Sequence, residues 1–169
     1  MLRAMLRNSS RERILFVCAN NICRSPLAAA IFRDHAARAG ILPKIDLDSA
    51  AINRAHVGHP VDPRALAVAA RHGYELPPRR ARKVGLGDFD RFTYILAMDE
   101  DNLRALLALR PTGHAGHVGL LLDLAPQLGV RDVPDPYHGS LATFERVIGL
   151  IEPAATTLVR DLATKLRTA

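Results

Sequence analysis

The sequence predicts an α/β fold, a three-layer sandwich with a central four-stranded parallel sheet flanked by helices. Short apolar segments alternate with amphipathic ones along all 169 residues. Such alternation of strands and helices is typical of a parallel sheet that is covered on both faces. No internal repeat or long linker divides the chain, and its length suits one domain with its own core.

Four segments have the composition of buried strands: residues 14–17, 47–50, 92–98 and 118–122. In folds of this class, ligands bind where the chain leaves the carboxyl ends of the strands. The loop after the first of these strands is such a place. It contains both cysteines of the chain, Cys18 and Cys23.

Two helices are predicted in the first half of the chain. Residues 26–38 follow the cysteine-containing loop and repeat apolar side chains at helical spacing. A second helix begins after Asp62, whose carboxylate can cap it, with Pro63 in its first turn. Gly73 stands where this helix should end.

Two more helices are predicted in the second half. Asp99 can cap a helix that Pro111 ends. From Ser140, apolar residues recur at helical spacing almost to the end of the chain. Pro153 lies inside this long C-terminal helix and should kink or break it.

The composition limits the partners that the protein can have. A formal charge of +6 suits anionic partners. Nucleic acid is not expected, because only 5% of residues are aromatic, Trp is absent and no base-stacking motif occurs. Membrane insertion is not expected either, because no apolar run approaches the roughly 20 residues that span a bilayer.

The termini and the cysteines predict the organisation and location of the chain. Residues 1–12 are basic and lack the apolar stretch of a signal peptide, so we expect a short, disordered N-terminal extension before a domain over residues 13–169. The lack of a signal peptide also predicts a cytoplasmic location, and two cysteines do not make a disulfide framework at this length. The histidine pairs His56/His59 and His114/His117 have no third ligand nearby in the sequence, so no metal site is predicted.

Residues 17–26 read VCANNICRSP and predict an oxyanion site with a nucleophile in it. Backbone N–H groups of a loop that curls into a helix form an anion cradle, which would hold inorganic phosphate or a similar oxyanion. A helix N-terminus and a nearby guanidinium lower the pKa of a thiol from about 8.5 and so produce the nucleophilic thiolate. Cys18 is the candidate thiolate, and Arg24 can bind two phosphoryl oxygens at once. Ser25 can donate toward the sulfur or cap the helix.

Cys23 has two possible roles. It is either a packing residue or a second thiol that traps an oxidised Cys18 as a disulfide.

Residues 17–26 resemble the active-site signature V-C-x-G-N-I-C-R-S-P of the low-molecular-weight protein tyrosine phosphatases. Only the glycine departs, and it is replaced by Asn20, a residue type that tolerates a positive φ. The resemblance implies Cys18 as the nucleophile and Arg24 as a phosphate ligand, with no metal or organic cofactor. It also implies that the rest of the loop binds phosphate or supports the site: Ala19, Asn20, Asn21, Ile22, Cys23 and Ser25.

Residues 133–139, VPDPYHG, contain the candidate general acid. A departing phenolate, with a pKa of about 10, needs a proton from a carboxylic acid. Asp135 lies between two prolines that stiffen its loop, whereas its rival Asp132 does not. The same family carries D-P-Y at this place, which implies Asp135 as the acid and Tyr137 as one wall of the pocket. His138 stands where many members have a second tyrosine.

Two segments between these motifs also resemble the family. Residues 49–52 (SAAI) resemble its S-A-G-T segment, and residues 56–64 (HVGHPVDPR) resemble its H-x-G-x-P-x-D-x-R segment. Ala55 stands where many members have an aromatic residue that stacks on the substrate ring. The resemblance extends from Arg13 to the end of the chain.

The resemblance implies an enzyme that hydrolyses phosphotyrosine in proteins, and aryl phosphates, through a phosphocysteine. By analogy with the family, its protein substrates include a bacterial tyrosine kinase. An arsenate reductase-like relative is disfavoured because no cysteine follows Cys23, and a protein arginine phosphatase because Ile22 stands where those enzymes tend to have threonine. A phosphate-binding or phosphocysteine-carrier module remains as a third alternative. Asp135 argues against it, because a carrier must preserve its phosphocysteine.

Overall fold

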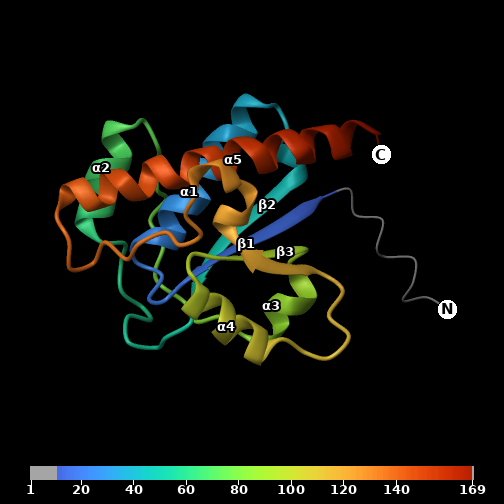
Figure 1. Ribbon diagram of the computed structural model, residues 1–169, viewed down its shortest axis with the longest axis horizontal. Coiled ribbons are helices and arrows are strands. Elements are labelled where there is room, and N and C mark those ends of the chain that lie inside the picture. The colour runs from blue at the N-terminus through green and yellow to red at the C-terminus, as the bar shows by residue number, and fades with distance from the viewer. Residues whose placement is uncertain (1–10, 169) are drawn as a thin grey trace.

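The sheet of the computed structural model, which describes residues 11–168, has four parallel strands in the order β2-β1-β3-β4 (Figure 1). The strands are β1 (Glu12–Cys18), β2 (Ile45–Ala51), β3 (Tyr94–Ala97) and β4 (His117–Leu120). Val17 pairs with Ala50 on one side and Ala97 on the other, so β1 is central and the carboxyl ends of its neighbours flank Cys18. The predicted fold class is confirmed.

Helices cover both faces of the sheet (Figure 1). Within residues 11–168, one face carries three helices: α1 (Arg24–Arg38), α2 (Pro63–Arg71) and α5 (Leu141–Thr168). The opposite face carries two in the same range: α3 (Leu86–Arg91) and α4 (Glu100–Leu109). The short 3₁₀ helices η2 (Leu42–Lys44), η3 (Leu121–Leu124) and η4 (Pro126–Leu128) connect these elements.

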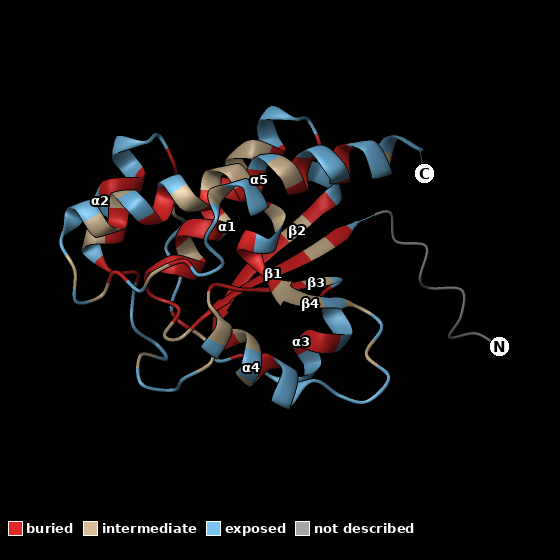
Figure 2. Ribbon diagram, viewed as in Figure 1, coloured by how far each residue is buried: buried red, intermediate tan, exposed pale blue. Residues whose placement is uncertain are grey.

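The alternating side chains of β1 divide the core into two layers. Phe16 and Cys18 face α1, where the rings of Phe16 and Phe32 lie 4.6 Å apart between centroids. Leu15 and Val17 face α3 and α4. Figure 2 shows the resulting buried strands between helices that are exposed only on their outer sides. The apolar environment around Cys18 is therefore built by the whole domain.

The helix signals are confirmed at three positions. Asp62 caps α2 by accepting a hydrogen bond from the Arg64 backbone N–H at 2.8 Å. Asp99 caps α4 through the Asn102 backbone N–H, also at 2.8 Å. Gly73 follows α2 with a φ of +77°. These signals act between near neighbours in sequence, so they are readable before the fold is known.

Of the two outcomes predicted at Pro153, a kink or a break of the helix, the break is wrong. The helix α5 runs unbroken from Leu141 to Thr168 with Pro153 inside it. The proline removes one backbone hydrogen bond, but Ile151 and Ala154 beside it are completely buried against the core. Their packing, together with the small residue Gly149 where the proline ring crowds the preceding turn, maintains the helix through this position.

Three further differences concern short elements. The strand predicted at residues 92–98 is only Tyr94–Ala97, because Phe92 ends the unpredicted helix α3. The strand predicted at 118–122 ends at Leu120, where η3 begins. At the N-terminus, residues 1–10 of the predicted extension lie outside the described residues, and Glu12 is the first residue of β1. No helix within residues 11–168 is both long and apolar enough to cross a membrane.

Candidate active site

The loop that joins β1 to α1, called here the phosphate loop (residues 18–24), surrounds the sulfur of Cys18 with hydrogen-bond donors. Cys18 is only 3% exposed. The backbone N–H of Asn21 donates to its Sγ at 3.2 Å, and Ser25 Oγ lies 3.0 Å from the same atom. A buried sulfur with two such neighbours is arranged to bear negative charge.

The left-handed residue of the loop is Asn21, not Asn20. Asn21 has a φ of +57° and is the only non-glycine residue among residues 11–168 with a positive φ. Asn20 does stand at the place of the family's glycine, but the reason given for that replacement, tolerance of a positive φ, is wrong because Asn20 does not have a positive φ. Left-handed backbone costs on the order of 1–3 kcal/mol, so Asn21 needs stabilising contacts.

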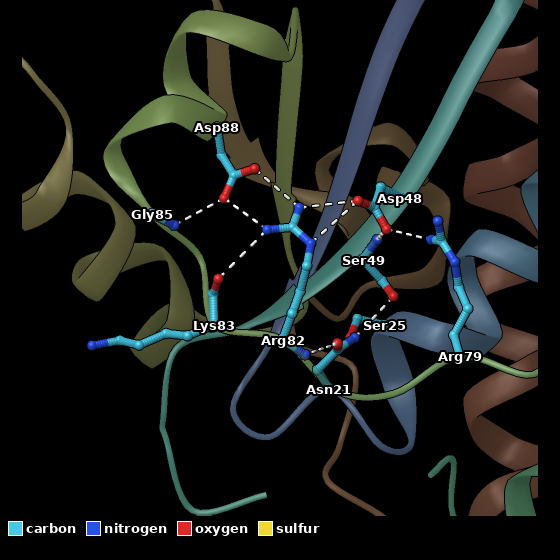
Figure 3. A network of polar contacts seen from close by, with 9 residues as sticks. All are labelled: Asn21, Ser25, Asp48, Ser49, Arg79, Arg82, Lys83, Gly85 and Asp88. Carbon is cyan, nitrogen blue, oxygen red and sulfur yellow. Dashed lines mark hydrogen bonds and ion pairs between the residues drawn. The ribbon is translucent and has the colours of Figure 1, made fainter. Parts of the chain in front are cut away.

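The Asn21 side chain supplies those contacts (Figure 3). Its Nδ2 donates to Ser25 Oγ and to Ser49 Oγ, each at 2.8 Å. Its Oδ1 accepts from the backbone N–H of Arg82 at 3.1 Å. The Arg82 guanidinium is in turn held between Asp48 and Asp88, at 3.1 and 3.0 Å.

Arg24 begins α1 and is 2% exposed. Its Nη1 donates to Asp99 Oδ2 at 2.5 Å and to the Val133 carbonyl at 3.0 Å, and its Nη2 lies 3.3 Å from Asp135 Oδ2. Burial alone would lower the pKa of Arg24, but the charge of Cys18 and the hydrogen bond to Asp99 raise it. The guanidinium is thus a fixed positive charge at the phosphate loop.

Asp99 is a site residue that the sequence analysis missed, because it was interpreted only as a helix cap. Its Oδ1 does cap α4, while its Oδ2 orients Arg24. Its position at the carboxyl end of β3, which neighbours β1, is the signal that could have identified it.

Asp135 and Asp132 occupy different positions. Asp135 lines the same cleft as Cys18 and Arg24, and its Oδ1 accepts from the Tyr137 backbone N–H at 3.2 Å. Asp132 instead accepts a hydrogen bond from the backbone N–H of Glu100, at the start of α4. Of the two candidate acids, only Asp135 is in that cleft.

Seven predicted site residues line this cleft: Cys18, Asn20, Ile22, Cys23, Arg24, Asp135 and Tyr137. Asn21 and Ser25 lie beneath it and contact the sulfur. Ala19 is not in the lining, and its carbonyl accepts a hydrogen bond from the backbone N–H of Asn53. The structure therefore brings nine of the ten predicted residues to the cleft or to Cys18.

Arg64 connects α2 to the segment that carries Asp135, called here the acid loop (residues 133–139). Its Nη2 donates to the Tyr137 carbonyl at 2.8 Å, and its Nη1 donates to the Gly139 carbonyl at 3.2 Å. Hydrogen bonds from Arg64 also hold the pKa of Asp62 below its usual value. The Asp62 backbone N–H donates to Ile22 in the phosphate loop, so this pair links the two loops.

Replacement of Arg64 by methionine is expected to displace the acid loop and its Asp135. The kcat of this site should fall on the order of tenfold, because a small displacement of a catalytic group is costly. The acid loop would lose two hydrogen bonds while the side-chain stem is kept. Steady-state kinetics should show the loss in kcat more than in KM. The control is Arg71→Met, also on α2, whose ion pair with Glu145 is exposed and 3.7 Å long. Equal losses in the two variants would contradict a positioning role.

The surroundings of Cys23 favour a protonated thiol. Burial first, and then the nearby charge of Asp62, raise the pKa of Cys23 far above that of an ordinary thiol. Its Sγ lies 3.8 Å from Asp62 Oδ2, as a donor. A protonated thiol fits the packing role better than attack on an oxidised Cys18, which requires a thiolate.

The rim of the cleft carries rings around Tyr137. His56 packs edge-on against Tyr137 with 5.7 Å between ring centroids. The ring centroids of Tyr137 and His138 lie 4.9 Å apart. Ala55, at the place of the family's stacking residue, is exposed. Among residues 11–168, no group of three or more His, Cys, Asp or Glu side chains is placed to hold a metal ion.

A family model described as low molecular weight phosphotyrosine protein phosphatase matches residues 13–168. The chain is 42% identical over 150 residues to a low molecular weight protein-tyrosine-phosphatase of Streptomyces coelicolor, covering 87% of this chain and 91% of that protein. It is 40% identical over 149 residues to the Bacillus subtilis phosphatase YfkJ, covering 88% and 94%. A crystal structure of a protein tyrosine phosphatase from Entamoeba histolytica superposes with a TM-score of 0.87 at 34% identity, covering 91% and 98%.

Proposed function

This chain belongs to the low-molecular-weight phosphotyrosine protein phosphatase family and hydrolyses phosphotyrosine in proteins, and we propose that Cys18, Arg24 and Asp135 perform the reaction. The observation that carries the assignment is that these three side chains line one cleft. The guanidinium of Arg24 contacts the carboxylate of Asp135 at 3.3 Å. Nucleophile, phosphate ligand and acid are thus within reach of one phosphoryl group.

In the first step, the thiolate of Cys18 attacks phosphorus. A sulfur–phosphorus bond forms, the bond between phosphorus and the tyrosyl oxygen breaks, and protonated Asp135 gives its proton to that oxygen. The donors on Sγ support this step, since the Asn21 N–H and the Ser25 hydroxyl stabilise sulfur as the thiolate. The products are free tyrosine in the protein and a phosphocysteine.

In the second step, water attacks the phosphocysteine. Asp135, now a carboxylate, accepts a proton from the water, phosphate leaves, and Cys18 returns to the thiolate. Arg24 serves both steps by binding the phosphoryl oxygens, whose charge grows in each transition state. Asp99 and the Val133 carbonyl already orient the guanidinium, so little ordering is needed on binding.

The apolar and aromatic rim supports an aryl phosphate as the substrate. Ile22 and Tyr137 both line the cleft. The edge-on pair of His56 and Tyr137 gives the substrate ring a wall that does not depend on an aromatic side chain at Ala55.

A phosphotyrosine peptide is expected to be hydrolysed with a kcat/KM at least about 100-fold above that of the same peptide with phosphoarginine, because an apolar pocket discriminates against a charged guanidine. The matched variant is Ile22→Thr, which should narrow this ratio by admitting the polar substrate. Both peptides are assayed by phosphate release. Faster hydrolysis of phosphoarginine by the unmodified protein would favour the arginine phosphatase alternative instead.

The proposal also includes the bounds of the domain, the product that the loop binds, the location of the protein and the type of protein substrate. The phosphatase domain corresponds to residues 13–169, and inorganic phosphate is the expected product ligand of the loop. Two buried free cysteines support a reducing, cytoplasmic location. A bacterial tyrosine kinase is the expected type of protein substrate.

A further inference from the structure

A short segment between α2 and α3, residues 82–84, lies against the carboxyl end of β2. The backbone N–H of Ala51 donates to the Arg82 carbonyl at 2.7 Å, and the Val84 N–H donates to the Ala51 carbonyl at 2.9 Å. Ala51 is also the β2 residue that pairs with Cys18. The backbone of Arg82 is therefore placed one strand away from the nucleophile.

The side chain of Arg82 holds this segment from two sides (Figure 3). On one side, its Nε and Nη2 donate to Asp48 Oδ2 at 3.2 and 3.1 Å. On the other, its Nη1 and Nη2 donate to the two carboxylate oxygens of Asp88, each at 3.0 Å. Asp48 belongs to β2, and Asp88 accepts from the Gly85 N–H at the start of α3. One guanidinium thus joins a strand and a helix through two buried carboxylates.

The backbone N–H of Arg82 orients the side chain of Asn21. It donates to Asn21 Oδ1 at 3.1 Å, and a backbone N–H can only donate, so the amide oxygen must lie on this side. The Nδ2 of Asn21 is thereby directed to the hydroxyls of Ser25 and Ser49, which both accept from it at 2.8 Å.

Both hydrogen-bond donors on the sulfur of Cys18 depend on this orientation. Ser25 accepts from Asn21, so its own proton can be directed to Sγ, 3.0 Å away. The second donor is the Asn21 N–H at 3.2 Å, which comes from the left-handed residue of the loop. The side-chain contacts of Asn21 offset the cost of that backbone conformation. A chain of contacts therefore runs from the Arg82 guanidinium to the sulfur.

We propose that Arg82 is a positioning residue for Cys18. Its guanidinium fixes the segment between β2 and α3, and its backbone N–H then holds Asn21 in the conformation that directs both donors at the sulfur. Removal of the guanidinium leaves the N–H in the chain but releases it from its fixed position. The thiolate should then be less well stabilised. This inference rests on the proposed role of Cys18 as the nucleophile.

The test measures how fast iodoacetamide alkylates Cys18 at different pH values, in a Cys23→Ser parent where Cys18 is the single thiol. The thiolate is the reactive form, so the midpoint of the pH profile reports how well the protein stabilises the anion. Arg82→Met is expected to raise this midpoint by about one pH unit, a tenfold change, the scale of one hydrogen bond to a charged group. Intact-mass spectrometry follows alkylation without any turnover.

Two further variants separate positioning from charge. Arg79→Met removes another guanidinium from Asp48 and should leave the midpoint unchanged, because Arg82 keeps both of its carboxylates. Asp88→Asn removes a negative charge, which by charge alone would favour the thiolate and lower the midpoint. We expect instead a rise of about half a pH unit, because Arg82 loses one of its two ion pairs.

Hydrolysis of p-nitrophenyl phosphate gives a second readout. The kcat/KM of Arg82→Met relative to the parent should be about one tenth at low pH and approach one at high pH. Partial unfolding would lower this ratio equally at every pH. An unchanged midpoint in Arg82→Met, an equal rise in Arg79→Met or a fall in Asp88→Asn would overturn the positioning role alone. A midpoint near 8.5 in the parent, the value of a free thiol, would overturn the nucleophile assignment and this inference with it.

Discussion

Replacement of Cys18 by serine is expected to lower the kcat for p-nitrophenyl phosphate by at least about 10⁴-fold, the scale of loss when a covalent nucleophile is removed. A serine hydroxyl is scarcely ionised at neutral pH, and Asp135 cannot serve as its base, because it must be protonated to act as the acid of the first step. The same donors that stabilise a sulfur anion, the Asn21 N–H and the Ser25 hydroxyl, leave the neutral hydroxyl unactivated. Steady-state phosphate release measures the loss.

The matched control is Cys23→Ser, which changes the other thiol of the same cleft. Its loss should be far smaller, because the raised pKa of Cys23 keeps that sulfur protonated. Rapid acid quenching with labelled substrate should trap phosphate on the unmodified protein and on Cys23→Ser, but not on Cys18→Ser. Near-complete activity in Cys18→Ser would remove the nucleophile assignment and with it the two-step mechanism.

Replacement of Asp135 by alanine is expected to slow kcat by about 10²–10⁴-fold, the usual contribution of a general acid. The loss should grow as the leaving group becomes more basic, because a nitrophenolate leaves without a proton whereas a tyrosyl oxygen does not. KM should change little, since Asp99 and the Val133 carbonyl still orient Arg24. A series of aryl phosphates with different phenol pKa values measures this dependence.

The matched control for Asp135 is Asp132→Ala, three residues away on the same segment. Asp132 accepts a hydrogen bond from the backbone N–H of Glu100 at the N-terminus of α4. Its loss should therefore lower the stability of the protein more than it changes how kcat depends on the leaving group. If Asp132→Ala produced the steeper dependence, the two carboxylates would have to exchange roles.

The sequence alone was sufficient for features that depend on near neighbours. The segment from Val17 to Pro26 is ten residues of strand end, anion cradle and helix start, and its key residue types have local reasons. The capping of α2 by Asp62 and of α4 by Asp99 also depends on bonds to residues two or three positions away. The flanking prolines mark Asp135 for the same reason, because they restrict its own backbone.

Contacts between distant residues could not be predicted in this way. The second role of Asp99, on Arg24, joins residues 75 apart in sequence. The contact between Asn21 Oδ1 and the Arg82 backbone spans 61 residues, and it explains why Asn21 rather than Asn20 has the positive φ. Both contacts depend on the strand order β2-β1-β3-β4, which no local pattern specifies.

The sequence by itself thus predicted the chemistry of the site: which residue attacks, which one binds phosphate and which one gives the proton. Those identities follow from side-chain type and short spacing, whose physical effects act over a few bonds. Only the tertiary structure decided how the phosphate loop is supported from Ser49 and Arg82, and that α5 continues through Pro153. These outcomes depend on burial and on the parallel register of the strands, which bring distant segments together and can outweigh a local preference.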